Sequence, residues 1–408
     1  MMNPSSRPSS SFLISLKSGL ITAPLALLGV MLLGGVACGG PAEAPDSAAG
    51  SEAAKDSPTV AAAPTLEIVA ESPKQWTGVA VAAEESGGER IFVNYPRWSD
   101  DVPVSVAELV AGEDGMLRPV PYPDEAWNGW SPEGDVAGSF VCVQALYADE
   151  RGSLWILDPA SPGFAGVVPG GAKLVQVDLA SNEVSRVYSF SPDAAPANSY
   201  LNDLRIDHGT GTAYISESGA GSLVVLDLES GDARRVLADH PSTSSEGIRL
   251  TIGGSEWLMG GEAMDVHADG IALSPDGESV YYQALTGRTL YRVPAASLRA
   301  ALGDEAAAAG LAEQVETVVE VGASDGIIFG PGGIYLSSLE LDAVRVWNPE
   351  DPEAGVTTVV QDERLAWPDS FARGAGGGTL YVTTAQIHRG AEPPEPYRLW
   401  RIAGLAAP

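Results

Sequence analysis

The stretch that decides the fold of this chain is Asp269-Gly-Ile-Ala-Leu-Ser-Pro-Asp-Gly277, followed by Val280-Tyr-Tyr282. It is typical of a short apolar strand, a turn in which Pro presets φ and Gly supplies a positive φ, and a second strand with aromatic residues. The same pattern of strand, turn and aromatic strand occurs six times. The first strands of these pairs are predicted at 77–81, 144–148, 203–207, 269–273, 325–329 and 369–372.

These repeats begin 44 to 67 residues apart, which is the length of one four-stranded propeller blade with its loops. Third strands are predicted at 173–178, 222–227, 289–293 and 343–347. The strand at 66–70 has no nearby partner, and the last repeat ends with a third strand at 398–402. We therefore predict an all-β fold, a six-bladed β-propeller over residues 66–408, in which the N-terminal strand completes the sixth blade and removes an open sheet edge. A helical insertion is expected from Ala295 to Leu311.

The first 65 residues are predicted to be a targeting signal followed by a flexible linker. A hydrophobic, uncharged run follows Arg7 and Lys17 and ends at Gly35-Val-Ala-Cys38, which indicates a signal peptide over residues 1–37. Its end resembles the bacterial lipobox, in which the Cys is acylated. The alternative is an uncleaved anchor, since the run approaches the ~20 residues needed to span a bilayer. Residues 38–65 are rich in Ala, Pro, Ser and acids and are predicted to be a flexible linker. We expect a protein lipid-anchored through Cys38 in the cell envelope, at the outer membrane or facing the periplasm or the exterior.

Acidic residues dominate the composition, with 54 Asp and Glu against 23 Lys and Arg and a formal net charge of −31. Such a chain repels nucleic acids and anionic lipids. We therefore expect no nucleic-acid partner, membrane contact through the lipid anchor alone, and a monomer. Cys142 lies in the apolar run Phe140-Val-Cys-Val143 and is predicted to be part of the core.

Several motifs together resemble the major royal jelly and Yellow protein family over residues 76–402. They are Tyr95-Pro-Arg-Trp98, Leu154-Trp-Ile-Leu-Asp158, Tyr200-Leu-Asn-Asp-Leu204, Asp269-Gly-Ile-Ala-Leu-Ser-Pro-Asp-Gly277 and Trp367-Pro-Asp-Ser-Phe371. The resemblance implies a six-bladed propeller, secretion, and a role in pigment chemistry or amine binding; related bacterial chains are called dopachrome-tautomerase-like. The related gluconolactonase-like propellers hold a metal ion near the axis with Glu, Asn and Asp. This chain has Thr77 where the first repeat would supply the Glu.

In a propeller the first strands line a central channel, so residues at one end of them face a common axis. Four of the six first strands begin with an acid. The predicted ligand-binding residues are Thr77, Gln144, Asn202, Asp203, Asp269, Asp325 and Asp369. Carboxylate and amide oxygens with no basic residue at these strand starts suit a hard cation such as Ca²⁺, and its predicted ligands are Asn202, Asp203, Asp269 and Asp325. The alternative is that an Asp before a Gly simply starts a strand.

Three residues are candidates for catalysis: Asp269, Asp325 and His267, which precedes Asp269 by two positions and could act as a general base. His388 is a further candidate for the channel mouth. Aromatic candidates for the floor of a pocket are Tyr95, Trp98, Trp127, Trp130 and Trp367. The chain contains no nucleophile elbow, Walker loop or H-E-x-x-H motif.

These observations predict a secreted, lipid-anchored propeller that binds a small polar or aromatic ligand in its axial pocket. A tautomerase- or isomerase-like activity is one function that such a pocket could have. One alternative is a metal-dependent lactonase or ester hydrolase, in which the cation polarises a carbonyl and an axial Asp activates water. Another is a protein-interaction platform. Whether the protein is an enzyme is open at this point.

Overall fold

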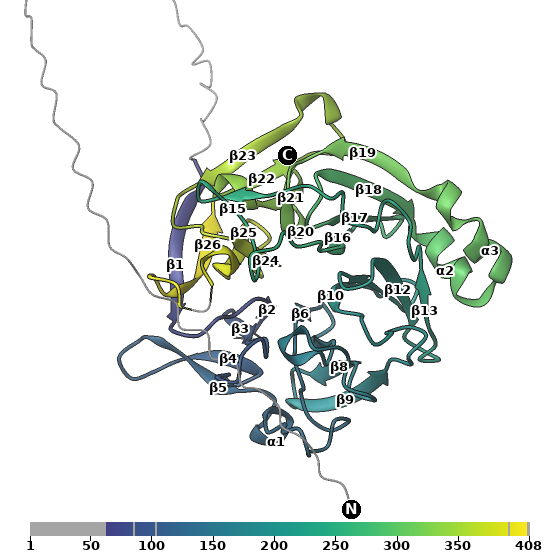
Figure 1. Ribbon diagram of the computed structural model, residues 1–408. Coiled ribbons are helices and arrows are strands. Elements are labelled where there is room, and N and C mark those ends of the chain that lie inside the picture. Colours follow the sequence, from purple (N-terminus) through teal and green to yellow (C-terminus); the bar gives the residue numbers. More distant parts are fainter. Residues whose placement is uncertain (1–62, 85, 103, 391, 406–408) are drawn as a thin grey trace, which may run out of the picture. The chain divides into compact units, whose positions relative to one another are not determined.

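Six four-stranded antiparallel sheets surround a central axis, with their first strands innermost (Figure 1). This arrangement confirms the predicted six-bladed β-propeller. The computed structural model describes residues 63–84, 86–102, 104–390 and 392–405. The predicted signal peptide, Cys38 and all but the last three residues of the linker lie outside the described residues. Within the described part of the chain, no helix is long and apolar enough to cross a bilayer.

The blades follow one another along the chain. The first blade consists of β2 (Val79–Ala83), β3 (Glu89–Asn94), β4 (Val106–Ala111) and β5 (Leu117–Pro121). The second consists of β6 (Ala145–Ala148), β7 (Ser153–Asp158), β8 (Lys173–Asp178) and β9 (Glu183–Ser189). The third consists of β10 (Leu201–Asp207), β11 (Thr212–Glu217), β12 (Ser222–Asp227) and β13 (Ala233–Val236). The next two consist of β16 (Ala268–Leu273), β17 (Ser279–Ala284), β18 (Thr289–Pro294) and β19 (Glu316–Glu320); and β20 (Ser324–Gly330), β21 (Gly333–Ser338), β22 (Ala343–Trp347) and β23 (Val356–Gln361). The predicted strands match these elements to within two residues at each end.

The sixth blade joins the two ends of the propeller. It contains β24 (Pro368–Arg373), β25 (Thr379–Thr384) and β26 (Tyr397–Ala403), and β1 (Thr65–Ser72) pairs antiparallel with β26 as its outer strand. The predicted closure by the N-terminal strand is therefore confirmed. The side chain of Ile68 is exposed, whereas Leu66 packs against the core of this blade.

The core lies between neighbouring blades. The aromatic residues that recur in the second strands pack sideways into the next blade, as Tyr281 of β17 does against Phe329 of β20, with ring centroids 5.5 Å apart. Cys142 is a buried free thiol, as predicted. Burial of these aromatic side chains between blades explains why the pattern in the sequence pairs a Gly-containing turn with an aromatic strand.

Three helical or hairpin segments interrupt the blades. The predicted insertion is present as α2 (Ala295–Gly303) and α3 (Glu305–Ala309), between β18 and β19. A short helix, α1 (Glu125–Asn128), follows the first blade. The connection from the third to the fourth blade holds a small hairpin of β14 (Thr251–Ile252) and β15 (Ser255–Glu256), which the sequence does not predict.

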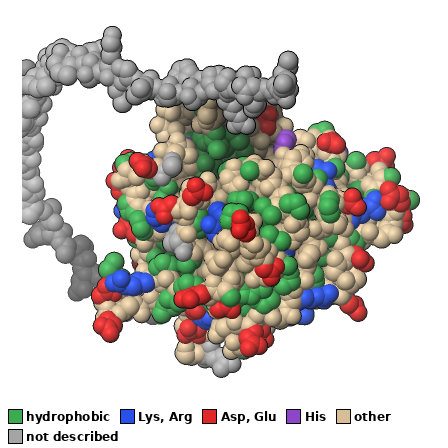
Figure 2. Space-filling model, turned by 60° about the horizontal axis from the view of Figure 1, so that its bottom comes forward, with side chains coloured by type: hydrophobic (Ala, Val, Ile, Leu, Met, Phe, Trp, Pro, Cys, Tyr) green, Lys and Arg blue, Asp and Glu red, His purple; other side chains and the backbone are tan. Residues whose placement is uncertain are grey.

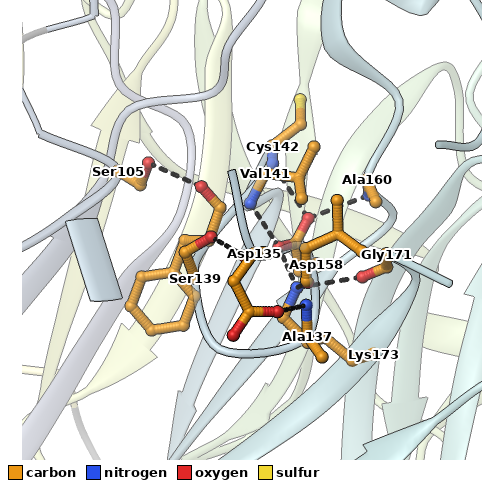
Figure 3. Close-up of polar contacts among 12 residues, drawn as sticks. Ser105, Asp135, Ala137, Ser139, Val141, Cys142, Asp158, Ala160, Gly171 and Lys173 are labelled. Atoms are coloured by element: carbon orange, nitrogen blue, oxygen red, sulfur yellow. Dashed lines mark hydrogen bonds and ion pairs between the residues drawn. The ribbon is translucent and has the colours of Figure 1, made fainter. Parts of the chain in front are cut away.

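A buried ion pair fixes the loop before β6 (Figure 3). The carboxylate of Asp158, at the end of β7, accepts hydrogen bonds from the backbone N–H groups of Val141 and Cys142 at 2.7 and 2.9 Å. The Nζ of Lys173 donates to Asp158 at 3.0 Å and to the carbonyls of Val136 and Gly171 at 2.9 and 3.0 Å. Neither charged side chain is more than 1% exposed. The pair therefore ties together two strands and a loop with all its polar groups satisfied.

Candidate functional site

A pocket of about 1640 Å³ lies at the end of the channel where the innermost strands begin. Five of the predicted ligand-binding residues line it, namely Gln144, Asn202, Asp269, Asp325 and Asp369. They come from five different blades, so the ring places residues that are far apart in the sequence around one cavity. Acidic side chains are also spread over one face of the molecule, among apolar ones and fewer basic ones (Figure 2).

Four innermost strands carry an irregularity at the same point. The pairing register shifts between positions 201 and 204, 268 and 271, 324 and 327, and 368 and 371. A β-bulge bends a strand and redirects the side chains at the bulge. The first residues inside these four bulges are Asn202, Asp269, Asp325 and Asp369, and all four line the pocket. The bulges therefore direct these four polar side chains into the pocket. We call the end of the pocket that they line its floor.

This register corrects one prediction. The repeats in the sequence suggest that Asp203 is equivalent to Asp269. In the structure Asn202 is the equivalent of Asp269, because Leu204 and Ile271 are the residues at which regular pairing resumes after the bulge. Asp203 is not among the residues that line the pocket. Its Oδ1 instead accepts a hydrogen bond from Arg205 at 2.8 Å.

Arg205 is the residue near the axis that the sequence reasoning missed. Its guanidinium reaches from β10 to the carbonyl of Ile327 on β20, two blades away, at 2.6 Å, and its Cζ lies 5.9 Å from the ring centroid of Tyr147 on β6. Side chains two positions apart on a strand lie on the same face. The spacing of Asp203 and Arg205 could therefore have indicated that these two side chains contact each other. No residue beyond the second position of an innermost strand lines the pocket. Arg205 therefore lies across the channel just past the pocket floor.

Hydroxyl groups on the second strands hold the bulges. The hydroxyl of Ser216 accepts the N–H of Asp203 at 3.0 Å and that of Ser337 accepts the N–H of Asp325 at 3.0 Å. Ser216 also donates to the carbonyl of Asp269 on the neighbouring blade. The glycine that follows Asp325 allows the innermost strands of two neighbouring blades to approach closely. A Cβ on Gly326 would lie 2.3 Å from the carbonyl oxygen of Asp369. The Asp-Gly pair thus reflects close approach of innermost strands as well as pocket chemistry.

The three acids of the floor are buried and each has a hydrogen-bond donor. Asn202 donates through Nδ2 to Oδ2 of Asp269 at 2.8 Å, and the indole N–H of Trp367 donates to Oδ2 of Asp325 at 2.7 Å. The hydroxyl of Ser370 donates to Asp369 at 2.9 Å. The carboxyls of Asp269 and Asp325 lie close enough for each to shift the pKa of the other.

Burial changes the protonation of these acids. Loss of solvation raises the pKa of Asp269 and of Asp369 well above the usual carboxyl range, and the charge of Asp325 adds to the effect on both. Burial also raises the pKa of Asp325, but only to about 6, because the hydrogen bonds from Trp367 and Asp269 favour its ionised form. The pKa values of the three carboxyls are therefore all raised, and that of Asp325 stays nearest to the ordinary carboxyl range.

Aromatic side chains form the wall above the acids. The indole N–H of Trp98 donates to the hydroxyl of Tyr200 at 2.7 Å, which donates to Oε1 of Gln144 at 2.9 Å. The ring of Phe164 lies 5.3 Å from that of Trp98 and 5.1 Å from that of Tyr200. Trp367 is buried and has a left-handed backbone, with φ of 58°. Backbone conformations of this kind concentrate at functional sites.

The other predicted residues divide between pocket and scaffold. Tyr95 and His388 line the pocket, and His388 stacks on Trp367 with a centroid distance of 6.0 Å. Burial, with a smaller contribution from Arg389, lowers the pKa of His388 to about 4, so this ring is neutral at physiological pH. Thr77 lies outside the lining and donates its hydroxyl to the carbonyl of Gln144 at 3.2 Å.

His267, Trp127 and Trp130 also lie outside the pocket lining. Nδ1 of His267 accepts the backbone N–H of Ser245 at 2.9 Å, which fixes the connection between the third and fourth blades. The structure therefore brings the two Asp candidates for catalysis together and leaves the His candidate in the scaffold.

The donor set at the floor does not fit a metal ion well. A cation needs free oxygen ligands, whereas N–H groups of Asn202 and Trp367 point at the carboxyls of Asp269 and Asp325. Within the residues that the structure describes, no group of three or more His, Cys, Asp or Glu side chains is arranged to hold a metal ion. The predicted set of Asn202, Asp203, Asp269 and Asp325 is also divided, because Asp203 pairs with Arg205.

Comparison with known proteins agrees with the fold and the motifs. The family model described as major royal jelly protein matches residues 141–390. Protein yellow of Drosophila yakuba is 27% identical over 232 residues, which cover 54% of this chain and 40% of that protein. Protein yellow of Drosophila melanogaster is 27% identical over 225 residues, covering 53% of this chain and 39% of that protein. The matched part thus spans about two fifths of the length of these relatives.

Among solved structures, a luciferin-regenerating enzyme superposes with a TM-score of 0.50 and 14% sequence identity, covering 84% of this chain and 96% of that one. At this identity the likeness concerns the fold alone. The family model covers more than half of the chain and includes the segments that carry Asn202, Asp269, Asp325 and Asp369. The chain therefore belongs to the major royal jelly protein family.

Proposed function

We propose that this protein binds a small polar or aromatic molecule in the axial pocket and moves protons on it, as a tautomerase or isomerase does. The observation that carries the proposal is the cluster of three buried carboxyls, Asp269, Asp325 and Asp369, at the floor of an aromatic-walled pocket. Buried acids with displaced pKa values in a concave site are typical of ligand-binding and catalytic centres.

The chemistry needs one group that accepts a proton and one that donates a proton. Ionised Asp325 takes a proton from one atom of the ligand, while protonated Asp269 gives a proton to another atom, so the ligand is isomerised without any oxidant or reductant. The contact between the two carboxyls then lets the proton return from Asp325 to Asp269. The hydrogen bond from Trp367 makes this division possible, because it favours the ionised form of Asp325.

Hydroxylated aromatic amines suit such a pocket. Their ammonium and hydroxyl groups pair with carboxyls, and their rings pack on the wall formed by Trp98, Tyr200 and Trp367. The family resemblance implies the same class of ligand. We propose further that the protein acts as a monomer, held at the cell envelope by an acylated Cys38.

Dopamine binding should become tighter as the pH rises. Its ammonium group stays protonated, whereas Asp325 has a pKa of about 6 and is ionised only above it. The affinity should therefore increase about tenfold between pH 5 and pH 7. Isothermal titration calorimetry at several pH values measures this, and Asp325→Asn should weaken binding about tenfold or more and remove the pH dependence.

Asp276→Ala is the matched control, because Asp276 lies in the exposed turn at the far end of the same type of hairpin. It should bind dopamine like the wild type. Binding that is unaffected by Asp325→Asn, or the absence of binding by dopamine and other hydroxylated aromatic amines, contradicts the proposed function.

The alternative of a metal-dependent hydrolase requires that the three carboxyls bind calcium. Because N–H donors point at these carboxyls, we expect millimolar Ca²⁺ to leave the melting temperature unchanged. Thermal unfolding with and without Ca²⁺ tests this. Stabilisation that grows with concentration, disappears in Asp269→Ala and persists in Asp276→Ala would instead establish a cation site and favour a metal-dependent lactonase or esterase.

A further inference from the structure

We propose that the ligand of the axial pocket is an amphiphile, with a cationic polar head at the acids and an extended apolar body that reaches the rim. The head rests on the proposed function, and the apolar body is the new element. The argument comes from three features of the pocket: its apolar rim, its size and the charge of its lining.

The rim carries exposed apolar side chains. Phe164, Leu258 and Met259 are 51%, 43% and 39% exposed, and all three line the pocket. Nine large apolar side chains are exposed within the described residues, and three of them lie at this one cavity. They come from two separate connections, between β7 and β8 and between the third and fourth blades. Single exposed apolar residues are ordinary on protein surfaces, whereas a group around a cavity marks a contact site.

The cavity is larger than a single aromatic ring requires. Its volume is about 1640 Å³, while pockets for drug-sized ligands are typically about 300–1,000 Å³. The apolar lining includes the half-buried ring of Trp98, and the rim adds the exposed side chains of Phe164, Leu258 and Met259. A ligand with a long apolar body buries this surface, which a small polar molecule would leave in contact with water.

The charge of the lining selects the head group. Besides the three acids of the floor, the lining includes Asp101, Asp265, Glu392 and Glu395. Its basic groups are Lys74, which is paired with Asp101, and the neutral ring of His388. A lining of this composition attracts an ammonium group and repels a sulfate or carboxylate. The combination of acidic floor and apolar rim therefore points to a cationic amphiphile.

The test uses n-alkylammonium ions from ethyl to decyl, below their micelle concentrations, in isothermal titration calorimetry with the full-length protein. Burial of each additional methylene should tighten binding roughly two- to fourfold until the chain passes the rim. Alkyl sulfates of the same length should not bind. Phe164→Ser and Leu258→Ser should each reduce the gain per methylene for the longer chains.

Met116→Ser is the matched control, because Met116 is the most exposed of these apolar side chains, at 66%, and lies outside the pocket. It should keep the wild-type dependence on chain length. Equal affinity for short and long alkylammonium ions overturns the amphiphile and leaves the proposed function standing. Chain-length dependence that is the same for ammonium and sulfate heads, and unaffected by Asp325→Asn, contradicts recognition by the acids and thus the proposed function itself.

Discussion

Deletion of residues 65–72 should destabilise the whole propeller by on the order of 5 kcal/mol or more, which is comparable with the total stability of many domains. The deleted strand, β1, pairs with β26 along its length, from Thr65 opposite Ala403 to Ser72 opposite Tyr397. Its loss removes ladder hydrogen bonds worth about 0.5–1.5 kcal/mol each and uncovers β26, whose Trp400 and Ile402 are buried. Because the sixth blade also packs against the first, the defect extends to the first blade of the propeller.

Urea denaturation followed by tryptophan fluorescence measures this effect. Ile68→Thr is the control, since Ile68 is exposed and Thr is a good strand former; it should change the unfolding free energy by less than about 0.5 kcal/mol. A deletion protein with an unchanged urea midpoint would show that the ring closes without β1.

Lys173→Met should lower the unfolding free energy by about 3–5 kcal/mol. Both partners of the ion pair are buried, so the substitution leaves the carboxylate of Asp158 without its counter-charge in a site without water access. It also removes the donor from the carbonyls of Val136 and Gly171. The N–H groups of Val141 and Cys142 still reach Asp158, which keeps the loop partly in place.

The chain contains a second Lys–Asp pair that serves as the matched comparison. Lys74 contacts Asp101 at the surface, with side-chain exposures of 39% and 76%. Lys74→Met should therefore cost less than about 1 kcal/mol. Thermal and urea unfolding of the two variants give the comparison. Equal effects of Lys173→Met and Lys74→Met would mean that the buried pair contributes no more than an exposed one.

The blades could be predicted because their signals are local. Ser274-Pro-Asp-Gly277 turns between two strands of alternating or apolar residues, and such signals need no knowledge of distant contacts. The ring closure could be predicted for a related reason, because the strand at 66–70 had no nearby partner and the last repeat ended at its third strand, 398–402, without a fourth. The helical insertion after Pro294 had the composition of a helix.

The pocket was predicted only in part, because its geometry depends on contacts between distant residues. The sequence indicated Asn202, Asp269, Asp325 and Asp369, but it also indicated Asp203, because the bulge that places Asn202 in the pocket depends on hydrogen bonds to the second strand and to the neighbouring blade. The bond between Trp367 and Asp325 joins residues 42 positions apart. The rim from 257 to 266 belongs to a connection without hydrophobic periodicity, so no repeat pattern predicted it.

The guanidinium of Arg205 has a consequence for the order of events in the pocket. Since it bridges β10 and β20 past the floor, we expect a ligand to enter and leave the pocket on the side of the rim. A ligand whose apolar body occupies the rim prevents the next ligand from entering until it has dissociated. Under the proposed function, release of the product past the rim then has to precede entry of the next substrate.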